Sequence, residues 1–160
     1  MTDVDPARFR QLLGRFATGV AVITATDAEG NPAGMTANTL ASVSLDPPLV
    51  SVCVDHAADM HRTLTQTQGF TLNILAADQE ALSRRFAEQG TRRFEEIGFH
   101  RTERGGIVLD GVLAHIECER FADFPAGDHS LHIGRVVGGI TAEGEPLLYY
   151  RGGYAGLGRG

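Results

Sequence analysis

The sequence predicts a mainly β protein, a closed antiparallel barrel of about six strands with helices at its periphery. Three observations support this. Apolar, β-branched runs of strand length recur along the chain, short turns rich in Gly, Pro and Asp separate them, and strands and helices do not alternate regularly. With 160 residues, of which 42% are hydrophobic, the chain has the size of a single domain over residues 1–160.

The chain is expected to begin with an amphipathic helix. Asp5 is a good N-cap, and Pro6 suits the first helical position because its missing N–H costs nothing there. We expect this helix to end near Gly19. Its apolar face follows helical spacing and consists of Phe9, Leu12, Leu13 and Phe16.

A hairpin is expected next. Residues 20–26 are apolar and β-branched, and residues 27–32 supply the turn that returns the chain antiparallel into the segment around Thr36. The Pro47–Pro48 pair lacks ladder donors, so it marks a crossing before a further strand at 49–54.

The remaining elements are expected in the order helix, strand, helix and three strands. Residues 57–68 form a helix and residues 70–75 a strand, and Asp78 caps a helix that turns Leu82 and Phe86 inward. A charged, irregular segment follows. The last strands are predicted at 113–121, 129–140 and 146–154.

Composition excludes several classes of protein. The net charge of −6, with 14 Lys and Arg against 20 Asp and Glu, argues against nucleic acid as a main partner. The N-terminus resembles no targeting sequence, and no apolar run is long enough to span a membrane, so a cytoplasmic protein is expected. Cys53 and Cys118 are expected to be reduced and buried, because nothing else suggests export.

Small and hydroxylated residues dominate the stretch from Gly34 to Val54. Short side chains let a flat polar ligand lie against a strand, while hydroxyl and amide groups remain free for a phosphate or a ring edge. The alternative is a turn-rich hairpin that binds nothing. The polar side chains concerned are Thr36, Asn38, Thr39 and Ser42.

Four motifs in fixed order resemble the short-chain flavin reductases, the small components of two-component flavin-dependent monooxygenases. They are FATGVAVITA (16–25), GMTANTLASVSLDPP (34–48), AGDHSLHIGRV (126–136) and PLLYYRGGY (146–154). The resemblance covers nearly the whole chain. It implies a six-stranded split β-barrel of Greek-key type that binds FMN and usually forms a homodimer. NADH or NADPH would reduce FMN or FAD there, and the reduced flavin would pass to a monooxygenase.

The resemblance also assigns flavin-binding residues. The Thr36 segment matches the part that contacts the ribityl chain and phosphate, the end of the following strand lines the flavin, and a helix approaches the phosphate. For Arg85 the alternative is a solvated arginine, and for Cys53 a buried thiol that acts as a hydrophobic side chain. The residues assigned are Thr36, Ala37, Asn38, Thr39, Ser42, Cys53, Val54, Asp55, Arg85 and Phe86.

His129 is the residue to which a catalytic role is assigned. Next to Asp128 at the entry of a strand, it could orient nicotinamide or stabilise charge on the reduced ring, although it could also be purely structural. Hydride transfer needs stacking and distance more than a general base. Tyr149, Arg151 and Tyr154 match the family's terminal motif and would complete the nicotinamide site; Tyr149 could instead pack in the core.

The chain departs from the family pattern at three positions. Relatives often carry Ser in place of Thr39, His in place of Tyr150 and a basic residue in place of Gly153. The last two departures leave the choice between NADH and NADPH open, and the absent cation favours NADH.

No metal is expected. His129 and His132 should point to opposite faces of a strand, and His56 and His61 to different faces of a helix.

Two functional classes remain. The first is an NAD(P)H-dependent flavin reductase that supplies a monooxygenase. The second is a split-barrel module that holds FMN tightly, as a redox carrier or sensor, without turnover. They differ in whether flavin exchanges as a substrate.

Overall fold

A seven-stranded antiparallel sheet forms the body of the protein in this computed structural model, which describes residues 3–90 and 92–158. The mainly β prediction is confirmed, but six strands were too few. Within the described residues the end strands β3 and β4 do not pair with each other, so a closed barrel is not seen. The order is β3 (Pro32–Ala37), β2 (Ala21–Thr26), β6 (Gly69–Ile74), β9 (Ala114–Ala126), β10 (His129–Thr141), β5 (Pro48–Asp55) and β4 (Ala41–Leu45).

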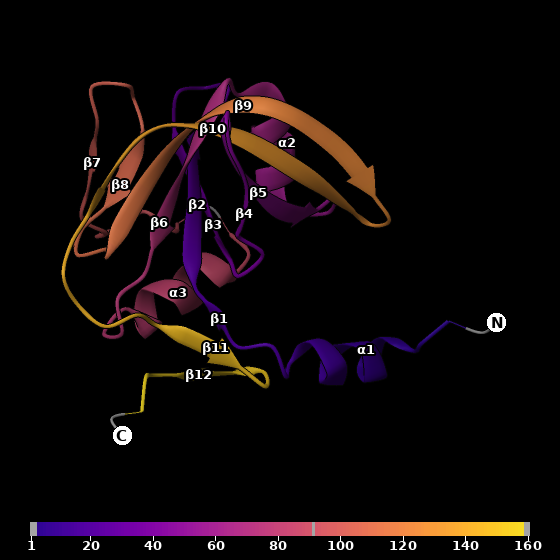
Figure 1. The fold of residues 1–160 in the computed structure, drawn as a ribbon. Coiled ribbons are helices and arrows are strands. Elements are labelled where there is room, and N and C mark those ends of the chain that lie inside the picture. The colour runs from indigo at the N-terminus through magenta and orange to yellow at the C-terminus, as the bar shows by residue number, and fades with distance from the viewer. Residues whose placement is uncertain (1–2, 91, 159–160) are drawn as a thin grey trace.

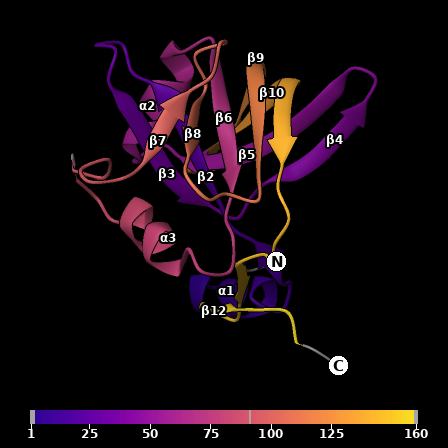
Figure 2. The ribbon, with the colours of Figure 1, turned by 90° about the vertical axis from the view of Figure 1, so that its left-hand side faces the viewer.

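Two smaller sheets and three helices surround this body (Figures 1 and 2). Figure 1 shows the β9–β10 hairpin projecting past α2, and the small β11–β12 hairpin at the opposite end beside α3 and β1. Described in chain order, these elements are α1 (Pro6–Leu13), β1 (Thr18–Gly19), α2 (Asp59–Gln66), α3 (Glu80–Ala87), β7 (Phe99–Arg101), β8 (Ile107–Leu109), β11 (Leu148–Tyr150) and β12 (Gly153–Ala155).

The N-terminal helix is shorter than expected. Asp5 caps it as predicted, since its carboxylate accepts hydrogen bonds from the backbone N–H groups of Ala7 and Arg8 at 2.9 and 3.0 Å. It ends at Leu13, however, and not near Gly19, because the backbone N–H of Gly14 closes the last turn. None of the helix is buried, so its apolar face is open on this chain.

Three other predictions need correction. α3 begins at Glu80 with Gln79 at the N-cap, so Asp78 does not cap it. The segment predicted to be irregular contains the β7–β8 ribbon, whose three-residue strands are too short to give a pattern. The last predicted strand is two strands, β11 and β12, joined at Arg151–Gly152, where both residues have positive φ as a type I′ turn requires.

The core consists of two clusters on opposite faces of the sheet. One joins Ile23 of β2 and Val52 of β5 to Leu64 of α2. These two strands are not neighbours in the sheet, so the sheet curls around this cluster. The second cluster contains Val22 and Phe86, with Leu82 packed against it, which confirms that α3 turns both residues inward.

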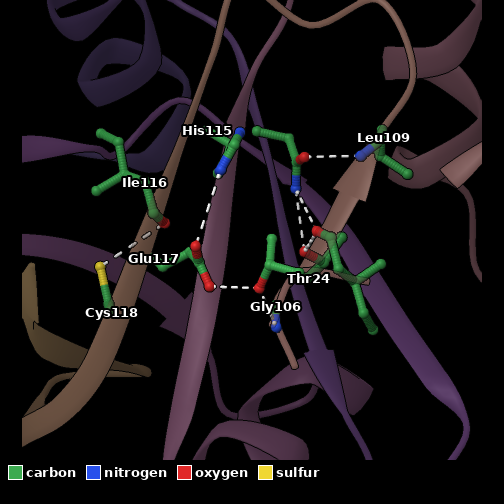
Figure 3. A network of polar contacts seen from close by, with 10 residues as sticks. Thr24, Gly106, Leu109, His115, Ile116, Glu117 and Cys118 are labelled. Atoms are coloured by element: carbon green, nitrogen blue, oxygen red, sulfur yellow. Dashed lines mark hydrogen bonds and ion pairs between the residues drawn. The ribbon is translucent and has the colours of Figure 1, made fainter. Parts of the chain in front are cut away.

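A buried polar layer lies between the sheet and the β7–β8 ribbon (Figure 3). The Asn73 amide donates to the carbonyls of Val22 and Ile107 at 3.3 and 3.2 Å, and its oxygen accepts from the backbone N–H of Leu109 at 2.9 Å. In the same layer the Glu117 carboxylate accepts from the Thr102 hydroxyl at 2.6 Å. Hydrogen bonds as well as apolar contacts therefore hold the ribbon in place.

The two cysteines differ in environment, and both are free. Cys118 is buried, and burial, with the Glu117 charge as a second cause, raises the pKa of its thiol to about 12. Cys53 is only half-buried.

We expect a thiol reagent at about pH 8 to modify Cys53 alone in the folded protein and both cysteines after denaturation. Rapid modification of Cys118 in the Cys53→Ser variant would contradict this.

No helix among residues 3–90 and 92–158 is long and apolar enough to cross a membrane.

Candidate functional site

The segment from Thr36 to Thr39 leaves β3 and lies between α3 and β5. The Thr36 hydroxyl donates to the backbone carbonyl of Ser83 at 2.6 Å. The Thr39 hydroxyl accepts from the backbone N–H of Cys53 at 3.0 Å and donates to its carbonyl at 3.1 Å. Both hydroxyls therefore fix the segment, and the exposed Asn38 amide is the group left free for a ligand within the described chain.

A pocket of about 220 Å³ opens beside this segment. At one wall the Ser83 hydroxyl and the Tyr154 hydroxyl lie 2.8 Å apart. The rings of Tyr149 and Tyr154 meet nearly edge to face, with 5.5 Å between their centroids. The structure therefore brings together two predicted groups of residues, one for flavin and one for nicotinamide. The lining residues are Val20, Thr36, Ala37, Asn38, Ser83, Ala87, Tyr149 and Tyr154.

Arg84 packs against Tyr154, one of the residues that line this pocket, and was not among the predicted site residues. Its guanidinium carbon lies 4.9 Å from the centroid of the Tyr154 ring, in cation–π geometry. Its Nη2 is 2.7 Å from the Glu80 carboxylate, which raises the pKa of Arg84 through that hydrogen bond. The Glu80–Arg84 spacing was the available signal, but such pairs are common on helices that bind nothing.

Arg85 and Phe86 do not line this pocket. The Arg85 guanidinium donates to the backbone carbonyls of Arg92 and Arg93, at 2.9 Å each, and of Glu95. It is thus neither a solvated arginine nor free to meet a phosphate in this conformation. Phe86 is fully buried, and a Cβ on Gly34 would lie 2.6 Å from its ring. The role of Arg85 and Phe86 in flavin binding stays a prediction. Their contacts indicate that they support the strand that leads to Thr36 and do not line the pocket.

His129 lies at the tip of the β9–β10 hairpin, after the two-residue turn Gly127–Asp128, where Gly127 has a φ of +65°. Its Nδ1 is 2.7 Å from the Asp128 carboxylate. That hydrogen bond lowers the pKa of Asp128. His129 pairs with Asp55 across the β10–β5 ladder, next to the pairs of Val54 and Cys53. The structure therefore gathers these predicted residues at one end of the β10–β5 ladder.

The tip of this hairpin is separate from the pocket lined by Tyr149 and Tyr154. Thr39 connects the two places, because it follows the pocket residues in sequence and is bonded to Cys53. Ser42 lies on exposed β4, paired with Val50, and Arg151 is exposed in the β11–β12 turn. Among the described residues, no side-chain hydrogen bond joins Ser42 or Arg151 to the pocket.

The histidines are arranged differently from what the sequence suggested. His132 is buried and His129 is partly exposed, as expected for opposite faces of a strand. His56 and His61, however, are in ring contact, with centroids 4.8 Å apart. His56 precedes α2 and so does not follow its helical spacing. No three metal-ligating side chains in residues 3–90 and 92–158 are placed to hold a metal ion.

The chemistry of the pocket suits the edge of a flat heteroaromatic ligand. It offers small side chains, backbone N–H groups and two aromatic rings, and these are the usual components of a cofactor site. At about 220 Å³ it is too small to enclose a whole dinucleotide, so most of such a ligand would lie along the open segment 36–39. Larger cavities, of about 540 and 840 Å³, lie elsewhere and contain none of the residues predicted to bind flavin.

Comparison with known proteins gives a consistent family. The model of the flavin reductase like domain matches residues 13–158. The FMN reductase (NADH) of Agrobacterium fabrum is 41% identical over 151 residues, which cover 94% of this chain and 86% of that protein. The reductase subunit of a flavin-dependent monooxygenase from Rhodococcus jostii is 37% identical, over 96% of this chain and 79% of its own length.

A solved structure agrees in fold. The NADH:FAD oxidoreductase of Streptomyces globisporus, in complex with NAD and FAD fragments, superposes with a TM-score of 0.91 at 34% identity. The match covers 99% of this chain and 98% of that one.

Proposed function

The chain belongs to the flavin reductase like domain family, and from this membership we propose that it is an NADH-dependent flavin reductase that supplies reduced flavin to a partner monooxygenase. By their names, one of the two relatives described above is an FMN reductase that uses NADH, and the other is the reductase subunit of a flavin-dependent monooxygenase. FMN and FAD are both candidates for the flavin. The partner would be a flavin-dependent monooxygenase component.

The observation that carries the proposal is the pocket between the Thr36 segment and the tyrosine pair. Two residue groups predicted from motifs more than a hundred positions apart in the chain meet there. A free Asn38 amide beside two aromatic rings is an arrangement typical of a ligand-binding site.

Each group has a distinct task in the proposed reaction. NADH supplies a hydride, with its two electrons, to bound flavin, and the enzyme must stack the two rings at contact distance. The segment 36–39 would hold the flavin through backbone N–H groups and Asn38, with Thr39 fixing it to β5. Tyr154 would close the nicotinamide side. His129 would orient nicotinamide and stabilise developing charge from the hairpin tip.

The test is NADH oxidation by the purified chain under air, followed at about 340 nm, with FMN, FAD or neither added. We expect turnover to require added flavin and to saturate with it, because flavin would then be a substrate. NADPH in place of NADH tests the nucleotide preference. Tight flavin binding without NADH oxidation would instead indicate the redox carrier or sensor.

We also propose a homodimer. The apolar face of α1 is open, with Phe9 and Leu13 57% and 53% exposed, and Phe16 is 74% exposed. An open apolar face of this kind on one chain usually marks an interface. A second copy with the same face satisfies the two-fold symmetry of most dimers.

Changing Phe9 and Leu13 together to serine is expected to shift the protein from dimer to monomer. The changes remove apolar area that one chain leaves in water, so the folded monomer should lose little stability. Light scattering after size-exclusion chromatography measures the mass. A wild-type protein that is monomeric at all concentrations would contradict the proposal.

A single domain over residues 1–160 and a cytoplasmic location stay predictions from the sequence. Two free cysteines support the second, since thiols persist in reducing compartments.

A further inference from the structure

Three imidazole rings lie in a row beneath the β9–β10 hairpin, in tilted ring contacts. His56 follows β5, His61 lies on α2 and His132 lies on β10. Ring centroids are 4.8 Å apart for His56 and His61, and 5.7 Å apart for His61 and His132. We call these three residues the histidine row.

The outer members of the row are fixed by hydrogen bonds, and the middle is not. The Nδ1 of His132 lies 2.8 Å from the Asp123 carboxylate, and the Nε2 of His56 lies 2.9 Å from the Ser130 hydroxyl. Between them the Nδ1 of His61 and the Nε2 of His132 are buried and have no hydrogen-bond partner among the described residues. Because the Nδ1 of His61 has no partner in the described chain, a charge on this middle ring would be costly.

The row is attached to the turn that carries His129. The backbone N–H of His56 donates to the carbonyl of Asp128 at 3.0 Å, and the His56 ring holds Ser130. These contacts reach the residues directly before and after His129. A shift of His56 would therefore move the position of the His129 side chain.

Protonation of His61 is opposed by its surroundings. Burial lowers the pKa of His61 below its ordinary value of 6.5, and the neighbouring His56 and His132 lower it further. Asp123 and Asp55 raise it but do not outweigh these causes. Arg120 forms an ion pair with Asp123 behind His132. Because the folded chain resists a proton that the unfolded chain accepts, stability is present near neutral pH and is lost as the pH falls below about 6.5.

We propose that His61 is a positioning residue for His129: the histidine row holds the β9–β10 turn on β5, and protonation of His61 in mild acid releases the turn and weakens the use of NADH. The inference rests on the proposed function and on the role of His129 in it. His61 itself touches neither flavin nor NADH. Flavin binding should be nearly unaffected, because the segment 36–39 is fixed by Thr39 independently of the row.

The first test replaces His61 with phenylalanine, which keeps an aromatic ring at this position but cannot be protonated. kcat/KM for NADH is measured from about pH 5.5 to about pH 8.5, with flavin affinity measured in parallel. Wild-type kcat/KM should fall on the acid side, approaching a factor of about ten for each pH unit once His61 is protonated. In His61→Phe this fall should be absent, while flavin affinity stays within about twofold. An unchanged acid fall in His61→Phe would assign it to His129 or another group and overturn the proposal.

His100→Ala is the matched control. His100 lies on β7 with a side chain that is 62% exposed, away from the row, so its loss should leave the acid fall intact. His61→Gln provides a second non-titrating variant should His61→Phe lose stability, and thermal unfolding reports which of the two is folded.

A second readout does not depend on activity. The backbone amide signals of Asp128 and Ser130 should move during an NMR titration of the wild type between about pH 8 and about pH 5.5, and should move clearly less in His61→Phe, which keeps His129 and His56 beside them. If these signals respond to His61 but no NADH is oxidised at any pH, the proposed function fails and the coupling of the row to the turn stands. If they do not respond, the positioning role is wrong even in an active enzyme.

Discussion

His129→Ala is expected to lower kcat/KM for NADH by about one hundredfold while flavin affinity changes by less than about threefold. The reason is geometric, because hydride transfer depends on how closely and in what orientation nicotinamide meets flavin. His129 stands at the tip of a hairpin, where its backbone pairs with Ala126 and Asp55 and its ring bonds to Asp128. Steady-state kinetics with varied NADH and an equilibrium flavin titration give the two numbers.

Two control variants make this result specific. His129→Gln keeps a hydrogen-bonding side chain of similar reach and should recover part of the lost rate. Asp128→Asn keeps the turn but removes the charge beside His129, so its effect reports the electrostatic part alone. Equal losses of flavin affinity and turnover in His129→Ala would refute the positioning role, and a lower unfolding temperature would indicate a structural histidine.

Phe86→Ala is expected to lower the free energy of unfolding by about 3–5 kcal/mol. The ring is fully buried between β3 and the loop that Arg85 holds. It lies edge to face with Phe94 at 5.0 Å between centroids, so its removal leaves a cavity and loses an aromatic pair. Urea unfolding followed by circular dichroism measures the change.

Phe86→Leu is the matched control and should cost clearly less, because leucine refills most of the volume. If Phe86→Ala weakened flavin binding in the folded protein while leaving stability unchanged, Phe86 would contact the ligand directly. The structure indicates instead that it acts by holding Gly34 and the strand that leads to Thr36.

Local rules predicted the elements well where the signal was strong. The cap at Asp5, the hairpin turn at 27–32 and the inward face of α3 are encoded within a few residues of each position. The prediction that Asp78 caps α3 was wrong, although Asp is a good cap in general. Here Gln79 takes the N-cap position, and its side chain accepts from the backbone N–H of Ala76.

Contacts between distant segments were harder to predict. The β7–β8 ribbon was missed because a three-residue strand such as Ile107–Leu109 is held by Asn73, far away in the sequence, and not by its own pattern. Closure of the sheet depends on pairings that no local pattern specifies.

The candidate site divides in the same way. Motif resemblance located Thr36, Asn38 and Tyr154, which do meet at one pocket. It could not show that the Arg85 guanidinium is occupied by backbone carbonyls, or that Arg84 lies over Tyr154 instead. Neighbouring arginines on a helix point in different directions, and only the packed structure shows which of the two contacts Tyr154.

The Asn73 layer also determines how the protein opens. Because the Asn73 side chain bonds β8 to β2, the β7–β8 ribbon cannot detach without exposing unpaired groups on the central strands. Amide protons of a short peripheral ribbon usually exchange rapidly with solvent, but the Leu109 amide proton should exchange only when the sheet itself opens. Ribbon and sheet therefore form one cooperative unit.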